Sequence, residues 1–306
     1  MNKSTLKRTL KGKESNEKRR KNIVKDLKSL FKAGVLLANV LPVLTGFCLA
    51  LYFAEEPFGA HWITFILTIS GSTFVMAGAL LLNNWYDADI DAVMERTKGR
   101  PTVTGSISLR VVFTLGIILS AVGVLLLLFT TIEATVYAVI GWITYVIFYT
   151  MWSKRRYTFN TIIGSVSGAV TPLIGWAVID SAMHPVPFVL FMILFIFQMP
   201  HTYVIAIRKF EEYKAAGVKM LPVVRGLRVT KWHTFIYIFL LIPLPFFIGE
   251  LGIWFMMITT IVNVGWLLLS IRGFFVSDDL RWANQMFRYS VYYLMITFLT
   301  AILVTF

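Results

Sequence analysis

Long apolar runs alternate with short polar connections along most of this chain. A helix needs about 20 residues to cross a bilayer, and several of the runs reach that length. Because lipid offers the backbone no hydrogen-bond partners, each run is expected to form a helix. The pattern predicts nine such segments, near residues 33–54, 62–83, 107–130, 132–151, 160–180, 186–207, 232–250, 251–271 and 286–306.

The composition indicates lipid rather than water as the solvent of the fold. Of the 306 residues, 57% are hydrophobic and only 15% are charged, whereas about a quarter of a soluble domain is charged. The single cysteine, Cys48, excludes an intramolecular disulfide and a cysteine-based metal site. We therefore predict an all-α integral membrane protein with the lipid bilayer as its surroundings.

Lysine and arginine are confined to alternate connections, which sets the expected orientation. Residues 1–32 hold 12 of the 29 basic residues, and the others follow the second, fourth, sixth and eighth segments. Positively charged loops stay in the cytoplasm. We expect nine transmembrane helices, a cytoplasmic N-terminus, an external C-terminus, a basic cytoplasmic tail at 1–32 and one domain at 33–306. The alternative for the tail is nucleic-acid binding, but we expect no nucleic-acid partner.

Three carboxylates follow the second segment, within the run NNWYDADID. In a continued helix, Asn83, Asp87 and Asp91 share one face, whereas Asp89 points elsewhere. Carboxylates so close together repel one another, and a cation relieves that repulsion. Mg²⁺ is commonly held by one or two carboxylates together with substrate phosphates, so Asn84, Asp87 and Asp91 are candidate ligands. The alternative is a solvated helix end.

Basic residues stand next to this acidic run. Arg96, Lys98 and Arg100 follow it directly, and Lys154 and Arg155 end the fourth segment in the run YTMWSKRR. Arginine and lysine pair well with diphosphate oxygens. By themselves these residues could simply set the topology. Beside the aspartates, they predict a metal-and-diphosphate site.

The sixth segment carries a histidine inside an apolar run. His201 shares a helical stripe with Arg208 and Glu212, and Lys209 lies beside them. A histidine at such a place is costly unless it has a partner, so it is a functional candidate, with packing as the alternative. The fifth segment, from Asn160, is rich in small residues, which favour close helix packing but could also leave room for a flat ligand.

Four sequence runs resemble a known superfamily. The run NNWYDADIDAVMERTKGRPTVTG resembles the first aspartate motif of the UbiA-type intramembrane prenyltransferases. More narrowly, NTIIGSVSGAVTPLIGW, FQMPHTYVIAIRKFEEYKAAGVKMLPVV and YTMWSKRRYTFNT resemble the protohaem IX farnesyltransferase branch. The resemblance extends over residues 33–306. In the sixth segment this chain has His201, Arg208 and Glu212 where most superfamily members have aspartates, so the resemblance does not imply two symmetrically held metal ions.

The resemblance implies nine helices around a central cavity that two long cytoplasmic loops cover. It implies farnesyl diphosphate and protohaem IX as substrates, haem O as product, Mg²⁺ as cofactor and a haem A synthase as a partner that could receive the product. It also implies a multi-pass protein of a bacterial cell membrane with a cytoplasmic active site. The expected catalytic residues are Asp87, Asp91, Tyr149 and Lys154. The expected substrate-binding residues are Asn83, Asn84, Arg96, Lys98, Arg100, Arg155, Asn160, His201, Arg208, Lys209 and Glu212.

Two other functions fit parts of the pattern. A sister prenyltransferase would act on the aromatic ring of a quinone precursor, and haem absorbance or product mass would separate it from the haem enzyme. A transporter with an acidic cation site is a rival of another class. Transporter charges are expected near the bilayer midplane, whereas the charges here lie at the ends of the segments.

The distribution of basic residues leads to a topology prediction. A reporter fused after Phe306 should lie outside the cytoplasm, because all the basic connections are on the opposite side. Alkaline phosphatase and green fluorescent protein fusions measure this, since each is active on one side only. A cytoplasmic reporter would show that one segment, the seventh or the eighth, was miscounted.

Overall fold

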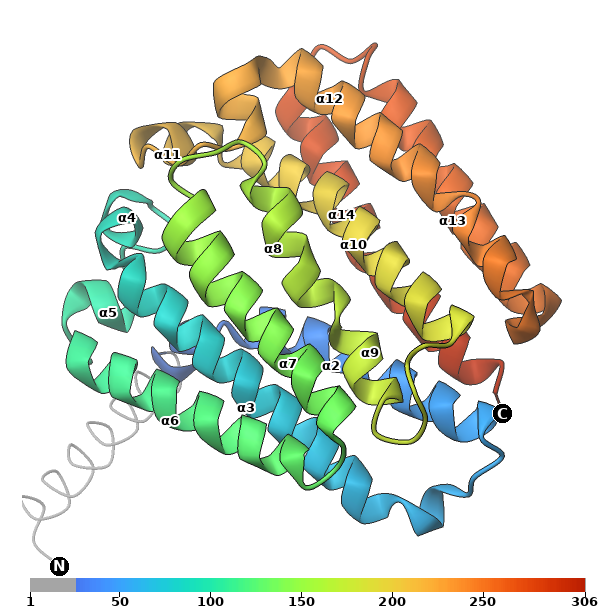
Figure 1. Cartoon of the computed structure of the whole chain (residues 1–306). Coiled ribbons are helices and arrows are strands. Elements are labelled where there is room, and N and C mark those ends of the chain that lie inside the picture. The colour runs from blue at the N-terminus through green and yellow to red at the C-terminus, as the bar shows by residue number, and fades with distance from the viewer. Residues whose placement is uncertain (1–25, 306) are drawn as a thin grey trace, which may run out of the picture.

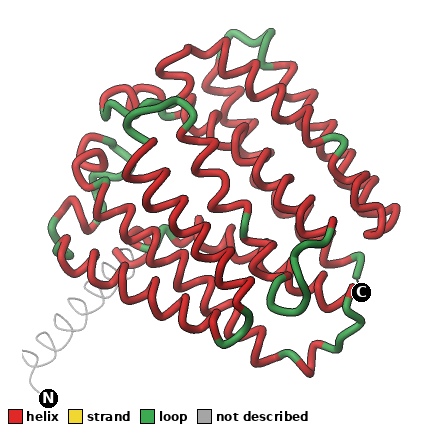
Figure 2. Tube along the Cα trace, viewed as in Figure 1, coloured by secondary structure: helices red, strands yellow, loops and turns green. Residues whose placement is uncertain are grey.

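The protein is described by a computed structural model that covers residues 26–305. Within this range every regular element is a helix (Figure 2). The long elements are α2 (Ala33–Phe53), α3 (Trp62–Tyr86), α6 (Leu109–Leu128), α7 (Ile132–Ile143) with its π-helical continuation η2 (Thr144–Ser153), α8 (Asn160–Ala169), α10 (Pro185–Arg208), α12 (Leu221–Leu241), α13 (Gly252–Arg272) and α14 (Asp279–Leu303). The short elements are η1 (Phe58–Ala60), α4 (Ala88–Val93), α5 (Pro101–Thr104), α9 (Thr171–Trp176), α11 (Phe210–Ala215) and η3 (Leu244–Leu251).

Seven helical stretches of the described chain are long and apolar enough to cross a membrane. One of them, Leu221–Arg272, contains both α12 and α13. The fifth predicted segment is divided at Val170 into α8 and α9, because Pro172 near the start of α9 lacks a backbone N–H. The prediction of a multi-pass membrane protein is therefore confirmed, whereas nine separate spans remain a prediction.

Two predicted segment starts differ from the structure. The hydrophobic pattern places the start of the ninth segment near residue 286, but α14 begins at Asp279. It places the start of the seventh near residue 232, after a long polar connection, but α12 begins at Leu221. The first half of α12 is rich in basic residues, so the hydrophobic pattern does not identify it as part of a transmembrane helix. Gly226, with φ 81°, interrupts the helix at this point.

The long helices form a closed arrangement around the centre of the molecule (Figure 1). α2 contacts both α3 and α14, α3 contacts α7 and η2, η2 contacts α8, and α8 contacts α10, which returns to α14. α6 covers the outside of α3, and α13 packs on α12 and α14 at the opposite flank. The short helices α4, α5 and α11 gather at one end of the bundle, where the basic connections lie (Figure 1). We call this the charged end.

α2 and α9 cross with their backbones nearly in contact. A Cβ atom on Gly46 would lie 2.1 Å from the Pro172 carbonyl oxygen, and one on Gly175 would lie 1.9 Å from the Val43 carbonyl oxygen. Small residues at such crossings let membrane helices approach closely. The crossing holds α9, the second half of the divided segment, against the first helix of the bundle.

The α2–α9 crossing generates a stability prediction. Gly175→Ala should destabilise the protein by about 1–3 kcal/mol, because the new methyl group meets backbone that can move only if the helices separate. Gly34→Ala is the matched control, since no atom lies within 4 Å of its added Cβ. Thermal unfolding of the purified proteins in detergent measures both. Equal Tm values for the two variants would contradict the close crossing.

Candidate active site

The break between α3 and α4 carries the buried carboxylates. Asp87 leaves the helical conformation (φ −91°, ψ 10°), so the helix is not continuous as the periodicity predicts. The backbone hydrogen bonds nevertheless continue, from Asp87 N–H to the Asn83 carbonyl (2.9 Å) and from Asp91 N–H to the Asp87 carbonyl (2.8 Å). The side chains of Asp87 and Asp91 are consequently 1% and 6% exposed, whereas that of Asp89 is 66% exposed.

Each buried carboxylate is paired with a cation from another part of the chain. Lys154, directly after η2, pairs with Asp87, and Arg100, directly before α5, pairs with Asp91. Asn83 Nδ2 donates to Asp87 Oδ2 at 2.8 Å. A buried charge without a partner is very costly, so each carboxylate requires its cation at this depth. The Lys154 pair therefore joins the end of η2 to the end of α3, and the Arg100 pair joins the α4–α5 connection to α4.

Asn83, Asp91, Arg100 and Lys154 line a cavity of about 180 Å³ at the charged end of the bundle, which we call the charged cavity. Asp87 is not on this wall but pairs with Lys154, which is. The cavity wall carries four cationic side chains and one carboxylate. Such an excess of positive charge suits a polyanion such as a diphosphate. The polar part of the wall consists of Lys32, Asn83, Asp91, Arg96, Arg100, Tyr145, Tyr149, Lys154 and Tyr213.

The two lysines of the charged cavity respond differently to their surroundings. Burial by itself would lower the pKa of Lys154, but the Asp87 carboxylate outweighs burial and raises that pKa above its ordinary value. The pKa of Lys32 is lowered instead, first by burial and then by repulsion from the cations of Arg100 and Lys154. The difference arises because Lys154 has a carboxylate partner and Lys32 has a neutral amide.

The π-helix η2 presents two tyrosines to the charged cavity. From Thr144 onward the α7 helix widens, and its last turn closes with a hydrogen bond from Lys154 N–H to the Tyr149 carbonyl, five residues back (3.0 Å). The rings of Tyr145 and Tyr149 lie 5.6 Å apart, and Lys154 Nζ is 5.9 Å from the Tyr149 ring centroid. π-helical turns are frequent at functional sites, and here the turn places two aromatic faces beside a cation.

Two predicted substrate-binding residues lie at the surface rather than on the cavity wall. Arg155 donates two hydrogen bonds of 2.7 Å to Asp89, which lower the pKa of that carboxyl. It remains 3.7 Å from Asp87. Lys98 pairs with Glu95 at 2.7 Å. The substrate-binding roles of Arg155 and Lys98 therefore remain predictions.

Two predicted asparagines bind backbone carbonyls and do not line the charged cavity. Asn84 Nδ2 donates to the Leu30 carbonyl at 2.6 Å, and its Oδ1 has no hydrogen-bond partner among residues 26–305. Asn160 Nδ2 donates to the carbonyls of Tyr157 (2.7 Å) and Lys219 (3.1 Å). Asn160 thereby ties the connection after η2 to the segment before α12.

The predicted site residues on α10 and just after it contact two different parts of the chain. His201 Nδ1 lies 2.7 Å from Ser290 Oγ on α14, and Arg208 Nε donates to Asn284 Oδ1 on the same helix at 2.7 Å. The His201 ring stacks on Phe197 with centroids 5.4 Å apart. Neither His201 nor Arg208 lines the charged cavity. They form a separate polar group between α10 and α14.

Glu212 faces the charged end instead. It accepts a hydrogen bond of 2.6 Å from Lys209 Nζ and one of 3.3 Å from the Arg96 backbone N–H. Burial raises the pKa of Glu212, but the bonds from Lys209 and Arg96 outweigh burial and leave the pKa below its ordinary value. The connection that carries Arg96 is thus held against α11.

Residue types alone did not identify every group on this wall. Lys32, the last residue of the predicted tail, reaches the charged cavity, and its Nζ donates to Asn83 Oδ1. Tyr145 and Tyr213 also line it. Tyr145 stands four residues before Tyr149, a helical spacing that signals a shared face. Lys32 carries no such signal, because it ends a long run of basic residues.

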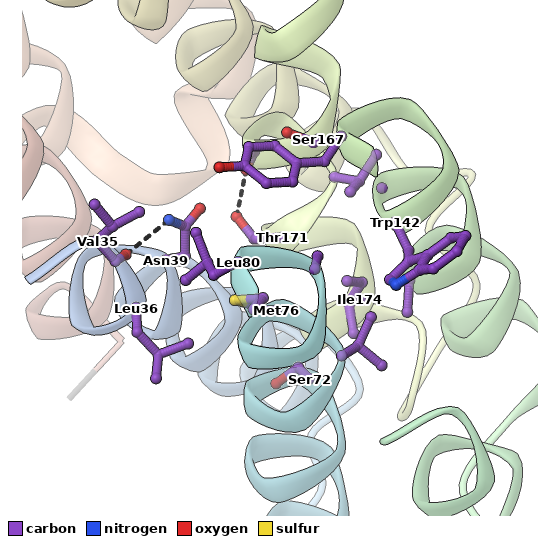
Figure 3. Close-up of a pocket in the computed structure, with 17 residues that line it drawn as sticks. Val35, Leu36, Asn39, Ser72, Met76, Leu80, Trp142, Ser167, Thr171 and Ile174 are labelled. Atoms are coloured by element: carbon purple, nitrogen blue, oxygen red, sulfur yellow. Dashed lines mark hydrogen bonds between the residues drawn. The ribbon is translucent and has the colours of Figure 1, made fainter. Parts of the chain in front are cut away.

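A second, apolar cavity of about 80 Å³ adjoins the charged one (Figure 3). Val35 and Tyr145 lie on the walls of both cavities, so the two are neighbours within the bundle. Figure 3 shows Met76, Leu80 and Ile174 on its wall. This apolar cavity lies between α2, α3, α7, α8 and α9.

Most polar side chains on the wall of the apolar cavity donate their hydrogen bonds to other protein groups. Four of them donate to backbone carbonyls three or four residues earlier in the chain, and the indole of Trp142 donates to Ser120 Oγ at 2.9 Å. The cavity therefore offers a hydrocarbon surface despite its polar residues. The four are Asn39 to Val35 (2.8 Å), Ser72 to Thr68 (2.7 Å), Ser167 to Gly164 (2.7 Å) and Thr171 to Gly168 (2.6 Å).

The charged cavity has oxygen atoms that fit Mg²⁺. Among residues 26–305, Asp87 Oδ1 is buried and accepts no hydrogen bond, and Asp91 adds a second carboxylate. The same residues contain no group of three or more His, Cys, Asp or Glu side chains that could hold a metal ion unaided. Mg²⁺ is usually held by one or two carboxylates with phosphate oxygens and water. The donor set thus fits an ion that shares its coordination with a diphosphate.

Comparisons with known proteins identify relatives along most of the chain. The protoheme IX farnesyltransferase of Oceanobacillus iheyensis is 50% identical over 95% of this chain and 93% of its own length. The protoheme IX farnesyltransferase 2 of Bacillus subtilis is 48% identical over 92% of both chains.

Solved structures share the fold. A digeranylgeranylglyceryl phosphate synthase structure has a TM-score of 0.71 at 20% identity and covers 92% of this chain and 98% of its own. A UbiA homologue from Archaeoglobus fulgidus bound to DMAPP and Mg²⁺ has a TM-score of 0.65 at 17% identity, with 90% of this chain and 99% of its own covered. Residues 39–292 match the UbiA prenyltransferase family. With a match over most of its length and close relatives in sequence, the chain belongs to the UbiA prenyltransferase family.

Proposed function

We propose that this protein transfers the farnesyl group of farnesyl diphosphate to a vinyl group of protohaem IX, giving haem O and diphosphate for terminal oxidase haem biosynthesis. The observation that carries the proposal is the cation-rich cavity, with the buried Asp91 on its wall and Asp87 paired with its Lys154, beside a cavity of hydrocarbon character. A prenyl diphosphate has the same two parts. The names of the relatives that are about half identical support farnesyl and protohaem as the particular substrates.

Each of the two cavities would bind one part of the prenyl donor. The diphosphate would bind in the charged cavity through Arg96, Arg100 and Lys154, whose side chains face it. The isoprenoid chain would extend past Tyr145 into the apolar cavity. Met76, at the apolar cavity, lies seven residues before Asn83 on α3, which corresponds to about 10 Å at 1.5 Å per helical residue. That depth places the first part of the chain among apolar side chains.

Mg²⁺ bound by Asp87 and Asp91, with Asn84 nearby, would neutralise part of the diphosphate charge. Lys154 and Arg100, which now pair with these two carboxylates, would then donate to diphosphate oxygens. The charge that develops on the leaving group is stabilised by cations already in place. The existing ion pairs thus keep the site assembled before the donor arrives.

The bond changes follow from this charge distribution. The C1–O bond of the donor breaks, and the diphosphate leaves with the electron pair. The allylic cation at C1 is attacked by the π electrons of the haem vinyl group, which forms the new carbon–carbon bond. Water adds to the resulting cation and loses a proton, giving a hydroxyethylfarnesyl side chain. The face of Tyr149, already near the Lys154 ammonium, would stabilise the allylic cation.

The membrane arrangement extends the proposal. We place the charged end in the cytoplasm of a bacterial cell, with nine spans in the cell membrane and one domain over residues 33–306. The support is the position of the basic connections, which gather at the end that holds α4, α5 and α11 (Figure 1).

Product formation tests the proposed function directly. The purified protein, incubated with protohaem IX, farnesyl diphosphate and Mg²⁺, should form a haem whose mass has increased by one farnesyl group and one hydroxyl group. Mass spectrometry of the extracted haem measures this. Prenylation of a quinone-precursor ring instead of haem would favour the sister activity.

The buried and exposed aspartates give a prediction with an internal control. Asp87→Asn or Asp91→Asn should lower turnover on the order of 100-fold or more, because a carboxylate that faces the diphosphate is lost. Asp89→Asn should keep turnover within a few-fold of the unaltered protein, since its side chain is exposed. Turnover is measured on variants that retain the gel-filtration profile of the unaltered protein. Equal losses at all three positions would contradict the single-face arrangement.

The separate polar group between α10 and α14 is proposed as part of the haem site. His201→Ala should weaken protohaem binding and leave farnesyl diphosphate affinity nearly unchanged, because His201 faces α14 rather than the charged cavity. Absorbance titration with protohaem and calorimetry with farnesyl diphosphate measure the two affinities. His61→Ala, in the connection before α3, serves as the control. Unchanged protohaem affinity in His201→Ala would exclude the haem role.

A further inference from the structure

Lys32 lies at the turn between residues 26–30 and α2, and its side chain is directed at the charged cavity. Its backbone is left-handed, with φ 47° and ψ 53°, a conformation that residues other than glycine seldom adopt. Nζ donates to Asn83 Oδ1, one helical turn before Asp87. The turn therefore brings a residue of the basic N-terminal segment to the buried carboxylates.

The unusual turn is held from the N-terminal side by buried contacts. Leu30 is 2% exposed and packs with Leu81 and Val112. Its carbonyl accepts the 2.6 Å hydrogen bond from Asn84 Nδ2. On the other side, the Lys32 carbonyl accepts from Val35 N–H at 2.7 Å as α2 begins. A strained conformation persists only where its surroundings determine it, and such positions cluster at functional sites.

The Lys32 ammonium differs from Lys154 and Arg100 in having no acidic partner among the described residues. Lys154 and Arg100 pair with Asp87 and Asp91. Among the residues that the structure describes, Lys32 forms no ion pair, and its partner is the neutral amide of Asn83. A cation on a wall that already has excess positive charge is stabilised best by an anion that enters the cavity.

We propose that Lys32 binds the diphosphate of the prenyl donor, with the turn before α2 holding its side chain on the wall of the donor site. The inference rests on the proposed function, because it takes a prenyl diphosphate as the ligand of the charged cavity. Nζ would donate to a diphosphate oxygen in a charge-assisted hydrogen bond. Lys32 would then contribute a cation that does not first have to separate from a carboxylate.

Calorimetry with farnesyl diphosphate and Mg²⁺, without protohaem, tests the proposal on the full chain. Lys32→Gln retains an N–H donor for Asn83 and removes the charge, so it should weaken binding about tenfold or more. Lys32→Arg should restore most of the affinity. The control is Lys28→Met, an exposed position on the same segment, which should bind as the unaltered protein does.

A second measurement separates binding from folding. The unaltered protein should prefer farnesyl diphosphate to farnesyl monophosphate, and Lys32→Gln should lose much of that preference, which general loss of structure would not alter. Diphosphate affinity of Lys32→Gln within twofold of the unaltered protein, or failure of the unaltered protein to bind farnesyl diphosphate, would overturn the proposal. Donor binding that depends on Lys32, without formation of farnesylated haem, would support Lys32 and overturn the proposed function alone.

Discussion

Burial of Asp87 and Asp91 beside Lys154 and Arg100 is the interaction on which the charged end depends. Removing one member of such a buried pair costs about 3–5 kcal/mol, because the remaining charge is left without compensation. Lys154 reaches the end of α3 from the end of η2, and Arg100 reaches α4 from the α4–α5 connection, so their pairs fix the positions of both. The walls of the cavity are held by this charge pairing together with the apolar cluster of Ile90, Met94 and Val218.

The same pairs connect stability with the proposed chemistry. Cations that balance the carboxylates in one state can stabilise a diphosphate in the next, provided that the carboxylates acquire another positive partner. The neighbouring apolar cavity needs no such balance, since its polar side chains donate to other protein groups. Tyr145 stands on the wall of both cavities, where the π-helical turn places it. One aromatic side chain thus marks the boundary between the polar and hydrocarbon parts of the site.

The α10 helix separates two groups that its sequence presents as one stripe. His201 and Arg208 face α14, whereas Glu212 joins the connection after α3. The end of α10 before Lys209 allows this division, because the chain changes direction there as α11 begins. A donor site and an acceptor site can then lie on different sides of one helix. In the same way, the turn at Lys32 brings this residue, which the sequence places in a polar tail, onto the wall of the charged cavity.

Hydrophobic segments by themselves determined the membrane class and most helix positions, because each apolar run must satisfy its own backbone hydrogen bonds in lipid. Helical periodicity also separated Asp89 from Asp87 and Asp91, since that distinction is local to a few turns. The polar start of α12 and the division at Val170 were not evident, because neither is encoded in average hydrophobicity. Only the tertiary structure decided that Lys154, rather than the adjacent Arg155, enters the cavity, and that Lys32 joins it. Residues next to each other in sequence can point to opposite sides, and their partners lie on elements that only the packing of the whole bundle brings together.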